Sequence, residues 1–164
     1  MCAAAKLLSL PEAVALRRRL KGEGRTVVLT NGVFDLLHDG HRHYLGHAAK
    51  LGDALFVALN SDASTRALKG PERPIEPQER RAAALGRLPE VAAVVVFEGK
   101  RLDREIAALA PDVYCKAGDY SLEKLDPGER AALERAGSRI EFMPFLPGHS
   151  TSGKIAKLKS EGKL

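Results

Sequence analysis

Two histidines, His38 and His41, stand three positions apart with Gly40 between them. A glycine lets the backbone turn tightly and approach a ligand closely. Residues 43–51 have the pattern of a helix, so the histidines lie close to a helix N-terminus. Unbonded N–H groups and the positive end of the helix dipole favour an anion at such a place. Two imidazoles added there suit a phosphate that gains negative charge during a reaction.

Histidines also bind zinc, and His43 and His47 follow the first pair closely. A catalytic zinc site needs three protein ligands and one open position. The glycine-rich turn around His38 and His41 is unlike the zinc-binding helix of a zincin. His43 and His47 are four residues apart on one helix face, and we expect that face at the surface. We therefore predict no metal ligation by these histidines.

The elements that must position these groups alternate along the chain. Apolar runs rich in β-branched residues predict strands at residues 25–29, 54–59, 92–97, 112–116 and 139–145. The helices are predicted at residues 9–22, 43–51, 65–68, 78–88, 102–109 and 126–136, with a last helix capped by Ser150 or Thr151. This alternation with short linkers indicates an α/β fold, a Rossmann-like doubly wound parallel sheet of about five strands with helices on both faces. We predict a single domain, 1–164, with its core at 25–155.

Local signals support several of these elements. Ser9 and Glu12 have the spacing of a capping box at the start of the first helix. Residues 17–19, all arginine, are expected on the solvated face of that helix. Cys115 lies within an apolar run and is expected to be a buried, inert thiol. Pro144 indicates that the last strand is an edge strand or ends there.

Polar and cationic residues follow the second predicted strand. Asn60 and Asp62 stand at its carboxyl end, where open α/β sheets bind their ligands. They are candidate substrate contacts, and capping of the next helix is an equal alternative. Lys69 and Arg73 belong to a loop, residues 69–77, that three prolines make stiff. This loop is either an ordinary surface loop or a cationic flap over a bound polyanion.

Composition limits the classes of partner. The 164 residues carry a net charge of +5, but aromatic residues make up only 5%, and no base-stacking or groove-reading motif is present. We therefore expect no nucleic-acid partner. We also expect no membrane partner, because no apolar run reaches the length of a membrane span. The N-terminus is too weakly apolar for a signal peptide, and two cysteines make no disulfide framework, so a cytoplasmic location is expected.

Residues 31–41, NGVFDLLHDGH, resemble the (T/N)GxFDLxHxGH signature of the cytidylyltransferase-like nucleotidyltransferases. Three further segments strengthen the resemblance. Residues 116–119, KAGD, are similar to the K(G/A)GD segment of the family, and residues 148–152, GHSTS, to its GxST(T/S) phosphate-binding motif. Residues 60–62, NSD, with residues 68–74, LKGPERP, resemble the NSD…LKGxxRP pattern of the D-glycero-D-manno-heptose 1-phosphate adenylyltransferases.

The resemblance implies an enzyme that transfers AMP from ATP to a sugar 1-phosphate, most closely D-glycero-D-manno-heptose 1-phosphate, with release of pyrophosphate. A cytidylyltransferase for glycerol 3-phosphate or a similar alcohol phosphate is the alternative among enzymes. A non-catalytic nucleotide-binding domain is the alternative of another class, and the intact histidines argue against it. Mg²⁺ is expected with the triphosphate, and a separate sugar kinase is expected in the pathway. Members are commonly dimers, so the resemblance allows a homodimer.

The resemblance also assigns site residues by position. His38 and His41 would contact the phosphates and stabilise charge around the α-phosphorus, and Lys69 would neutralise the outer phosphates, so these three are the expected catalytic residues. The expected nucleotide-binding residues are Thr30, Asn31, Gly32, Val33, Phe34, Gly40, Lys116, Gly118, Asp119, Ser150 and Thr151. The residues expected to bind the acceptor substrate are Asp35, Asn60, Asp62 and Arg73.

Overall fold

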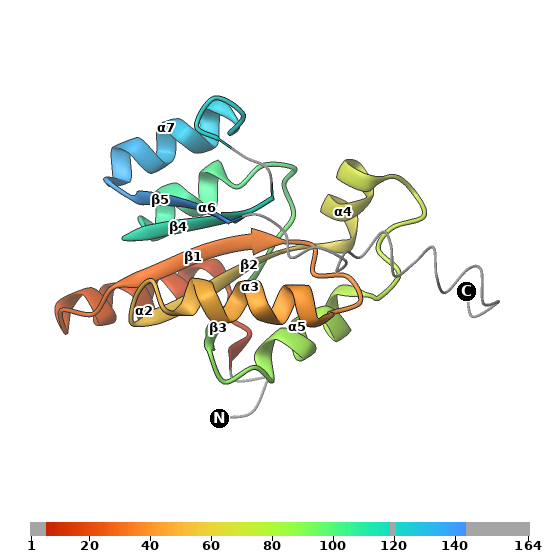
Figure 1. The fold of residues 1–164 in the computed structure, drawn as a ribbon, viewed down its shortest axis with the longest axis horizontal. Coiled ribbons are helices and arrows are strands. Elements are labelled where there is room, and N and C mark those ends of the chain that lie inside the picture. The colour runs from red at the N-terminus through yellow and green to blue at the C-terminus, as the bar shows by residue number, and fades with distance from the viewer. Residues whose placement is uncertain (1–5, 119–120, 144–164) are drawn as a thin grey trace.

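The computed structural model describes residues 6–118 and 121–143, in which parallel strands form one five-stranded sheet (Figure 1). The strands are β1 Val27–Gly32, β2 Ala54–Asn60, β3 Val91–Phe97, β4 Val113–Ala117 and β5 Arg139–Met143. The helices are α2 Leu10–Gly22, α3 Asp39–Ala49, α4 Asp62–Lys69, α5 Gln78–Gly86, α6 Asp103–Leu109 and α7 Pro127–Ala136. The predicted Rossmann-like α/β architecture is confirmed.

The strand order creates a switch point beside β1. In space the order is β3-β2-β1-β4-β5, so the chain passes outward from β1 to β3 and then returns to place β4 on the other side of β1. Open α/β sheets bind their ligands at the carboxyl ends of the strands, where the order reverses. The crevice beyond the ends of β1 and β4 is therefore the expected binding place, and the histidine segment follows β1 directly.

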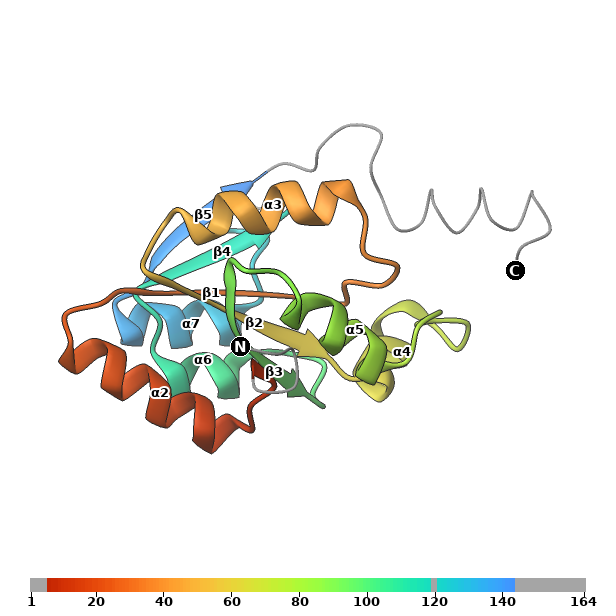
Figure 2. The same ribbon diagram turned by 90° about the horizontal axis from the view of Figure 1, so that it is seen from below.

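Helices cover both faces of the sheet. Figure 2 shows α3 on one side and α2 and α6 on the other. α3 and α5 pack through a cluster of buried residues that includes Leu45 and Leu85. α2, α6 and α7 pack through a second cluster that includes Leu20, Ile106 and Leu133. Every residue of β2 is buried, as expected for a central strand covered on both faces.

Several local predictions are confirmed and one boundary moves. The Ser9–Glu12 capping box is present at the start of α2. β5 lies at the edge of the sheet, as predicted, whereas Pro144 lies outside the described residues. α3 begins at Asp39, earlier than predicted, because His38 acts as its N-cap. An imidazole is not among the usual N-cap groups, so the sequence did not indicate this start.

Arg17 contradicts the prediction that residues 17–19 form a solvated face. Its guanidinium pairs with Asp112 at 2.9 Å and is 5% exposed, whereas the other two arginines are exposed. It also donates to the carbonyl oxygens of Leu109 and Ala110, at the end of α6. A cation at a helix C-terminus satisfies carbonyl groups that have no partner within the helix. The prediction is wrong for Arg17, which instead joins α2 to α6 and β4.

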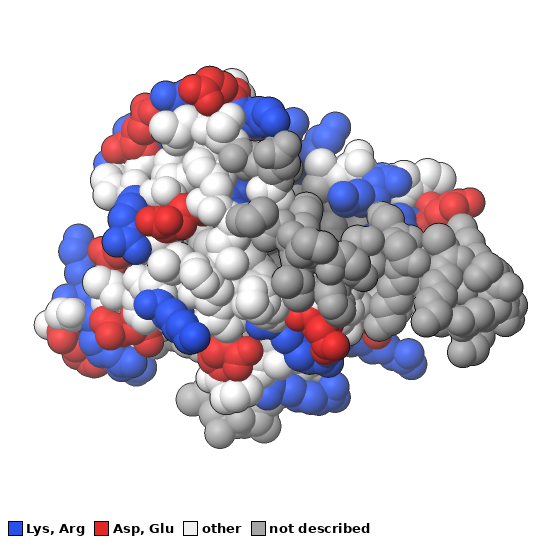
Figure 3. Space-filling view, in the orientation of Figure 1, with Lys and Arg blue, Asp and Glu red and all other residues white. Residues whose placement is uncertain are grey.

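On the face shown in Figure 3, basic and acidic side chains are interspersed. Exposed charges also form ion pairs in the described residues, such as Arg130 with Glu134 on α7. Among the helices of the described residues, none has the length and apolar character needed to cross a membrane.

Candidate active site

His38 and His41 form a reciprocal cap at the start of α3, directly beyond the carboxyl end of β1. Nδ1 of His38 accepts the N–H of Gly40 at 3.0 Å and the N–H of His41 at 3.4 Å. In return, Nδ1 of His41 accepts the N–H of His38 at 3.2 Å. The two imidazole rings stack with their centroids 3.8 Å apart. Each ring therefore holds the backbone that carries the other ring.

These hydrogen bonds determine the tautomer of both rings. A ring nitrogen that accepts an N–H bond carries no proton itself, so Nδ1 of each neutral imidazole is bare. The proton of each ring is then on Nε2, which gives one N–H donor per ring in addition to the capping bonds. Two such donors at the positive end of a helix suit the oxygens of a phosphate.

The same bonds correct one expectation from the sequence. The sequence predicts unbonded N–H groups at this helix start as part of the anion site. In the structure the N–H groups of His38, Gly40 and His41 donate to imidazole nitrogens. Anion binding at this helix start therefore depends on the imidazoles and the helix dipole, and not on those three amides.

A close contact explains why β1 ends in glycine. A Cβ at Gly32 would lie only 2.9 Å from the ring carbon Cε2 of Phe34, which is closer than real Cβ atoms approach. Phe34 has a φ of 48° and is 7% exposed. Its ring packs edge-on against His41, with the centroids 5.4 Å apart. Gly32 thus allows Phe34 to fold back and support the histidine.

Two residues of β1 join the strand to its neighbours at the site. Thr30 is fully buried, and its hydroxyl bonds that of Tyr44, which donates to the carbonyl oxygen of Cys115 at 2.8 Å. Oδ1 of Asn31 accepts the hydroxyl of Tyr114. Burial raises the pKa of both Tyr44 and Cys115, so both groups stay protonated at neutral pH. Thr30 therefore lies beneath the site, where it ties α3 to β1 and β4.

Asp35 ties the proline-rich flap to the histidine segment. Its carboxylate is buried and accepts the N–H of Ile75 at 2.8 Å and that of Glu76 at 3.0 Å. Nε of Arg73 donates to the same carboxylate at 3.2 Å. Glu76 accepts the N–H of Leu36 at 3.0 Å in return. Asp35 and Arg73 are thus brought together in the structure, while their contact with an acceptor stays a prediction.

Arg81 holds a central position that the sequence did not reveal. Its side chain is fully buried and pairs with Asp62 at 2.8 Å. It also donates to the carbonyl oxygens of Val33 at 2.7 Å, Asn60 at 2.8 Å and Glu76 at 3.0 Å. These carbonyl groups lie just beyond β1, at the end of β2 and in the flap. One guanidinium therefore fixes the three segments that surround the crevice.

A weak signal for the burial of Arg81 exists in the sequence. Arg81 precedes Leu85 by four residues on α5, so the two side chains share the buried face of that helix. The preceding residue, Arg80, is exposed. A pair of adjacent arginines resembles an ordinary solvated helix face, which hides this signal.

Asn60 and Asp62 flank the residue that caps α4. The cap itself is Ser61, whose hydroxyl accepts the N–H of Ser64 at 3.0 Å. Asn60 is 3% exposed, and its amide donates to the hydroxyl of Ser64 at 2.9 Å. Asp62 keeps 28% of its side chain exposed beside Arg81. Of the two, Asp62 is the residue that still faces solvent, and a substrate contact by either one stays a prediction.

Lys69 and Lys116 bring positive charge to the same edge of the sheet. Lys69 ends α4, and Lys116 lies near the end of β4. Burial lowers the pKa of Lys116; Glu129 opposes this shift, while the charges of Arg101 and Lys69 lower the pKa further. Gly118 follows with a φ of 110°, which favours glycine.

Three expected nucleotide-binding residues, Asp119, Ser150 and Thr151, lie outside the described residues, and their roles stay predictions. His43 and His47 are exposed on α3, as predicted. Within residues 6–118 and 121–143, no group of three or more histidine, cysteine, aspartate or glutamate side chains could hold a metal ion.

The histidine segment and its surroundings match a known family. Residues 29–152 match the sequence model described as cytidylyltransferase-like. This chain belongs to the cytidylyltransferase-like family. The match includes both histidines, the flap and the end of β4, which the structure gathers at the carboxyl edge of the sheet.

Relatives of this cytidylyltransferase-like chain include the bifunctional protein HldE of Salmonella arizonae and of Salmonella newport. Each is 45% identical over 154 residues, which cover 94% of this chain but 31% of the relative. The chain thus spans about a third of the length of those relatives. Among solved structures, the lipopolysaccharide core biosynthesis protein from Thermoplasma volcanium matches with a TM-score of 0.60 at 27% identity, over 75% of this chain and 98% of that one. Pantoate-beta-alanine ligase from Francisella tularensis matches with a TM-score of 0.58 at 11% identity, over 90% of this chain and 69% of that one. A likeness at this identity shows the fold alone.

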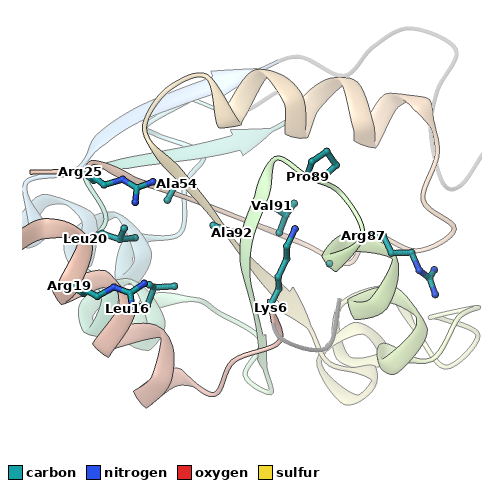
Figure 4. A pocket seen from close by; sticks show the side chains of 11 residues that line it. Lys6, Leu16, Arg19, Leu20, Arg25, Ala54, Arg87, Pro89, Val91 and Ala92 are labelled. Carbon is teal, nitrogen blue, oxygen red and sulfur yellow. The ribbon is translucent and has the colours of Figure 1, made fainter. Parts of the chain in front are cut away.

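A cavity of about 700 Å³ lies at the opposite end of the cytidylyltransferase-like domain (Figure 4). Its lining includes Lys6, Arg19 and Arg25, together with Ala54 and Val91, the first residues of β2 and β3. The cavity therefore lies at the amino ends of the strands. Ligands of open α/β sheets bind at the carboxyl ends. None of the predicted site residues lines this cavity, so we do not assign it to the active site.

Proposed function

We propose that this enzyme transfers AMP from ATP to D-glycero-D-manno-heptose 1-phosphate and forms ADP-heptose and pyrophosphate. The observation that carries the proposal is the reciprocal cap of His38 and His41 at the switch point of the sheet. The segments NSD and LKGPERP and the 45% identity to HldE support the choice of a sugar phosphate. The likeness to a lipopolysaccharide core biosynthesis protein supports the same choice.

The proposed reaction requires positioning and charge stabilisation more than proton transfer. A phosphate monoester is largely dianionic near neutral pH, so its oxygen attacks without a general base. A bond forms between that oxygen and the α-phosphorus of ATP. The bond from the α-phosphorus to the bridging oxygen breaks, and pyrophosphate leaves with the electron pair. Nε2–H groups of His38 and His41 would stabilise the negative charge that develops on the α-phosphate oxygens and on the leaving group.

Other residues would bind the nucleotide in this proposal. Asp119 would contact the ribose, Ser150 and Thr151 would hold phosphate at the last helix, and Lys69 would neutralise the outer phosphates. Mg²⁺ would enter with ATP, held by phosphate oxygens and water, which is its common mode of binding in nucleotide sites. A sugar kinase would supply the acceptor, and we place the reaction in the cytoplasm.

Pyrophosphate release provides the test. ATP, CTP, GTP and UTP are each incubated with Mg²⁺ and either anomer of heptose 1-phosphate or glycerol 3-phosphate. We expect release with ATP and one anomer of heptose 1-phosphate. The family description as cytidylyltransferase-like favours a second candidate, for which release would require CTP and glycerol 3-phosphate. Nucleotide binding without release under any condition would instead indicate a non-catalytic nucleotide-binding domain.

A further inference from the structure

A second group of positive charges lies at the carboxyl edge, on the other side of the sheet from the histidines. Along β4, Cys115 packs in the cluster beneath α3, whereas Tyr114 packs in the cluster beneath α6 and α7. Side chains alternate along a strand, so Lys116 points to the same side as Tyr114. Burial lowers the pKa of Lys116, the charge of Glu129 on α7 acts to raise it, and the charge of Arg101 acts to lower it. The histidines belong to the α3 side of the same edge.

The short loop that carries Arg101, residues 98–102, is fixed at both ends. The carbonyl oxygen of Gly99 accepts the hydroxyl of Ser64 at 2.7 Å, which ties the loop to α4. The N–H of Leu102 donates to Glu129 at 2.7 Å, which ties it to α7. Arg101 itself lies 3.4 Å from Asp126, the N-cap of α7, and its side chain is 55% exposed. The loop of Arg101 is thus tied to α4 and α7, and more than half of the Arg101 side chain is open to solvent.

We propose that Arg101 and Lys116 form the subsite for the phosphate of the acceptor, so that Lys116 binds the acceptor and not the nucleotide to which the resemblance assigns it. This inference rests on the proposed nucleotidyl transfer and gives the acceptor its own place in the crevice. Arg101 would reach the phosphate from the loop after β3, and Lys116 from the end of β4. Two carboxylates face these cations: Asp126 pairs with Arg101 at 3.4 Å, and the charge of Glu129 acts to raise the pKa of Lys116.

In-line displacement at the α-phosphorus requires a binding site for the acceptor phosphate that is separate from the site of the leaving pyrophosphate. The attacking oxygen and the leaving pyrophosphate lie roughly in line on opposite sides of the α-phosphorus. An α-phosphate over the end of β1 would have His38 and His41 on one side and Arg101 and Lys116 on the other. The acceptor phosphate is a dianion and must approach a triphosphate that is itself strongly negative. Two cations on the far side offset that repulsion, and a guanidinium can bind two phosphate oxygens at once.

The transfer itself needs no further group. The acceptor phosphate oxygen forms its bond to the α-phosphorus, and the bond to the bridging oxygen breaks as pyrophosphate departs with the electron pair. No proton is moved, because the acceptor is already a dianion. The roles of Arg101 and Lys116 are therefore binding and orientation of the acceptor, which places their effect on the acceptor KM.

Steady-state kinetics of three variants provide the first test. Arg101→Gln and Lys116→Gln each remove one proposed cation, and Arg104→Gln removes an exposed cation of α6 as the matched control. We expect the KM for heptose 1-phosphate to rise at least about 10-fold in the first two variants, since bonds to charged groups contribute this much. The KM for ATP should stay within about twofold, and Arg104→Gln should match the wild type. A rise in the KM for ATP with an unchanged acceptor KM would overturn the proposal.

A binding measurement separates this subsite from the proposed function. The protein is saturated with α,β-methylene-ATP, and inorganic phosphate is titrated by calorimetry or NMR. We expect phosphate to bind the wild type and Arg104→Gln alike, and Arg101→Gln at least about fivefold more weakly. Equal phosphate affinity in wild type and Arg101→Gln, or no phosphate binding to the wild type, would overturn the subsite. Lack of turnover with every acceptor would overturn the proposed function, and the phosphate titration would still decide the subsite.

Discussion

His38 and His41 cap one another across the first turn of α3. The N–H of each residue donates to Nδ1 of the other, at 3.2 Å and 3.4 Å, and the rings stack at 3.8 Å. The usual partners in such a capping box are a hydroxyl and a carboxylate or amide. Here the groups that stabilise the helix start are the groups expected to meet the phosphates. Helix capping and catalysis can therefore be separated only by variants that keep one and remove the other.

His41→Gln is such a variant. Glutamine at the third helical position can still accept the N–H of the N-cap residue. We expect the unfolding midpoint to stay close to that of the wild type, while kcat falls by at least ~100-fold, a typical cost of removing one transition-state donor. Pyrophosphate release and thermal unfolding followed by circular dichroism measure the two effects. Near-normal turnover in this folded variant would show that His41 has only a structural role.

His38 can be tested in the same way with two substitutions. Asparagine is a good N-cap residue, whereas alanine is a poor one. We expect His38→Ala to lose about 1 kcal/mol of unfolding free energy relative to His38→Asn. Both should lose turnover to the same degree, because neither supplies an imidazole. If turnover followed the helix cap and recovered in His38→Asn, the catalytic assignment of His38 would be wrong.

Replacement of Arg81 should destabilise the three segments that surround the crevice. Arg81→Met leaves the partly exposed carboxylate of Asp62 and three carbonyl oxygens without their donor. We expect a loss of about 3 kcal/mol, since each buried polar group left unsatisfied costs about 1–3 kcal/mol. Arg80→Met at the exposed neighbouring position should change the unfolding free energy by less than about 0.5 kcal/mol. Urea unfolding of both variants gives the comparison, and equal effects would contradict the role of Arg81.

Glu105 should make stability depend on pH. It is 8% exposed, and burial raises its pKa above the ordinary value of 4.5. Ionisation of Glu105 therefore costs stability at neutral pH, and this cost disappears as the pH falls through the raised pKa toward 4.5. We expect Glu105→Gln to be more stable than the wild type at pH 7, with an advantage that shrinks toward pH 4.5. Denaturant unfolding across this range, with the exposed Glu98→Gln as control, measures the effect. If the stability advantage of Glu105→Gln over the wild type grew as the pH fell, the prediction would be wrong.

The order of strands and helices could be predicted because it depends on local patterns. β-branched runs marked the strands, and the Ser9 cap marked the start of α2. The position of His38 and His41 beyond β1 followed from the same patterns, and so did the proline-rich loop after α4. These features need only the residue types within a few positions of each element.

The roles of Arg17 and Arg81 could not be predicted because their partners are distant in the sequence. Arg17 bonds carbonyl oxygens some ninety residues away at the end of α6, and Arg81 bonds Val33 beyond β1. Both sit in arginine runs that resemble solvated faces. The reciprocal histidine cap was also hidden, since imidazole is a rare N-cap group. The sequence patterns therefore predict where the histidine segment lies but not the bonds that hold it in shape.

The most direct test of the central claim follows the α-phosphate of ATP. The protein is incubated with Mg²⁺, heptose 1-phosphate and ATP labelled at the α-phosphorus, and in parallel with ATP labelled at the γ-phosphorus. We predict that the α-label appears in ADP-heptose and the γ-label in pyrophosphate. Transfer of the γ-label to the sugar, or label transfer only from CTP, would contradict AMP transfer from ATP as the function of this site.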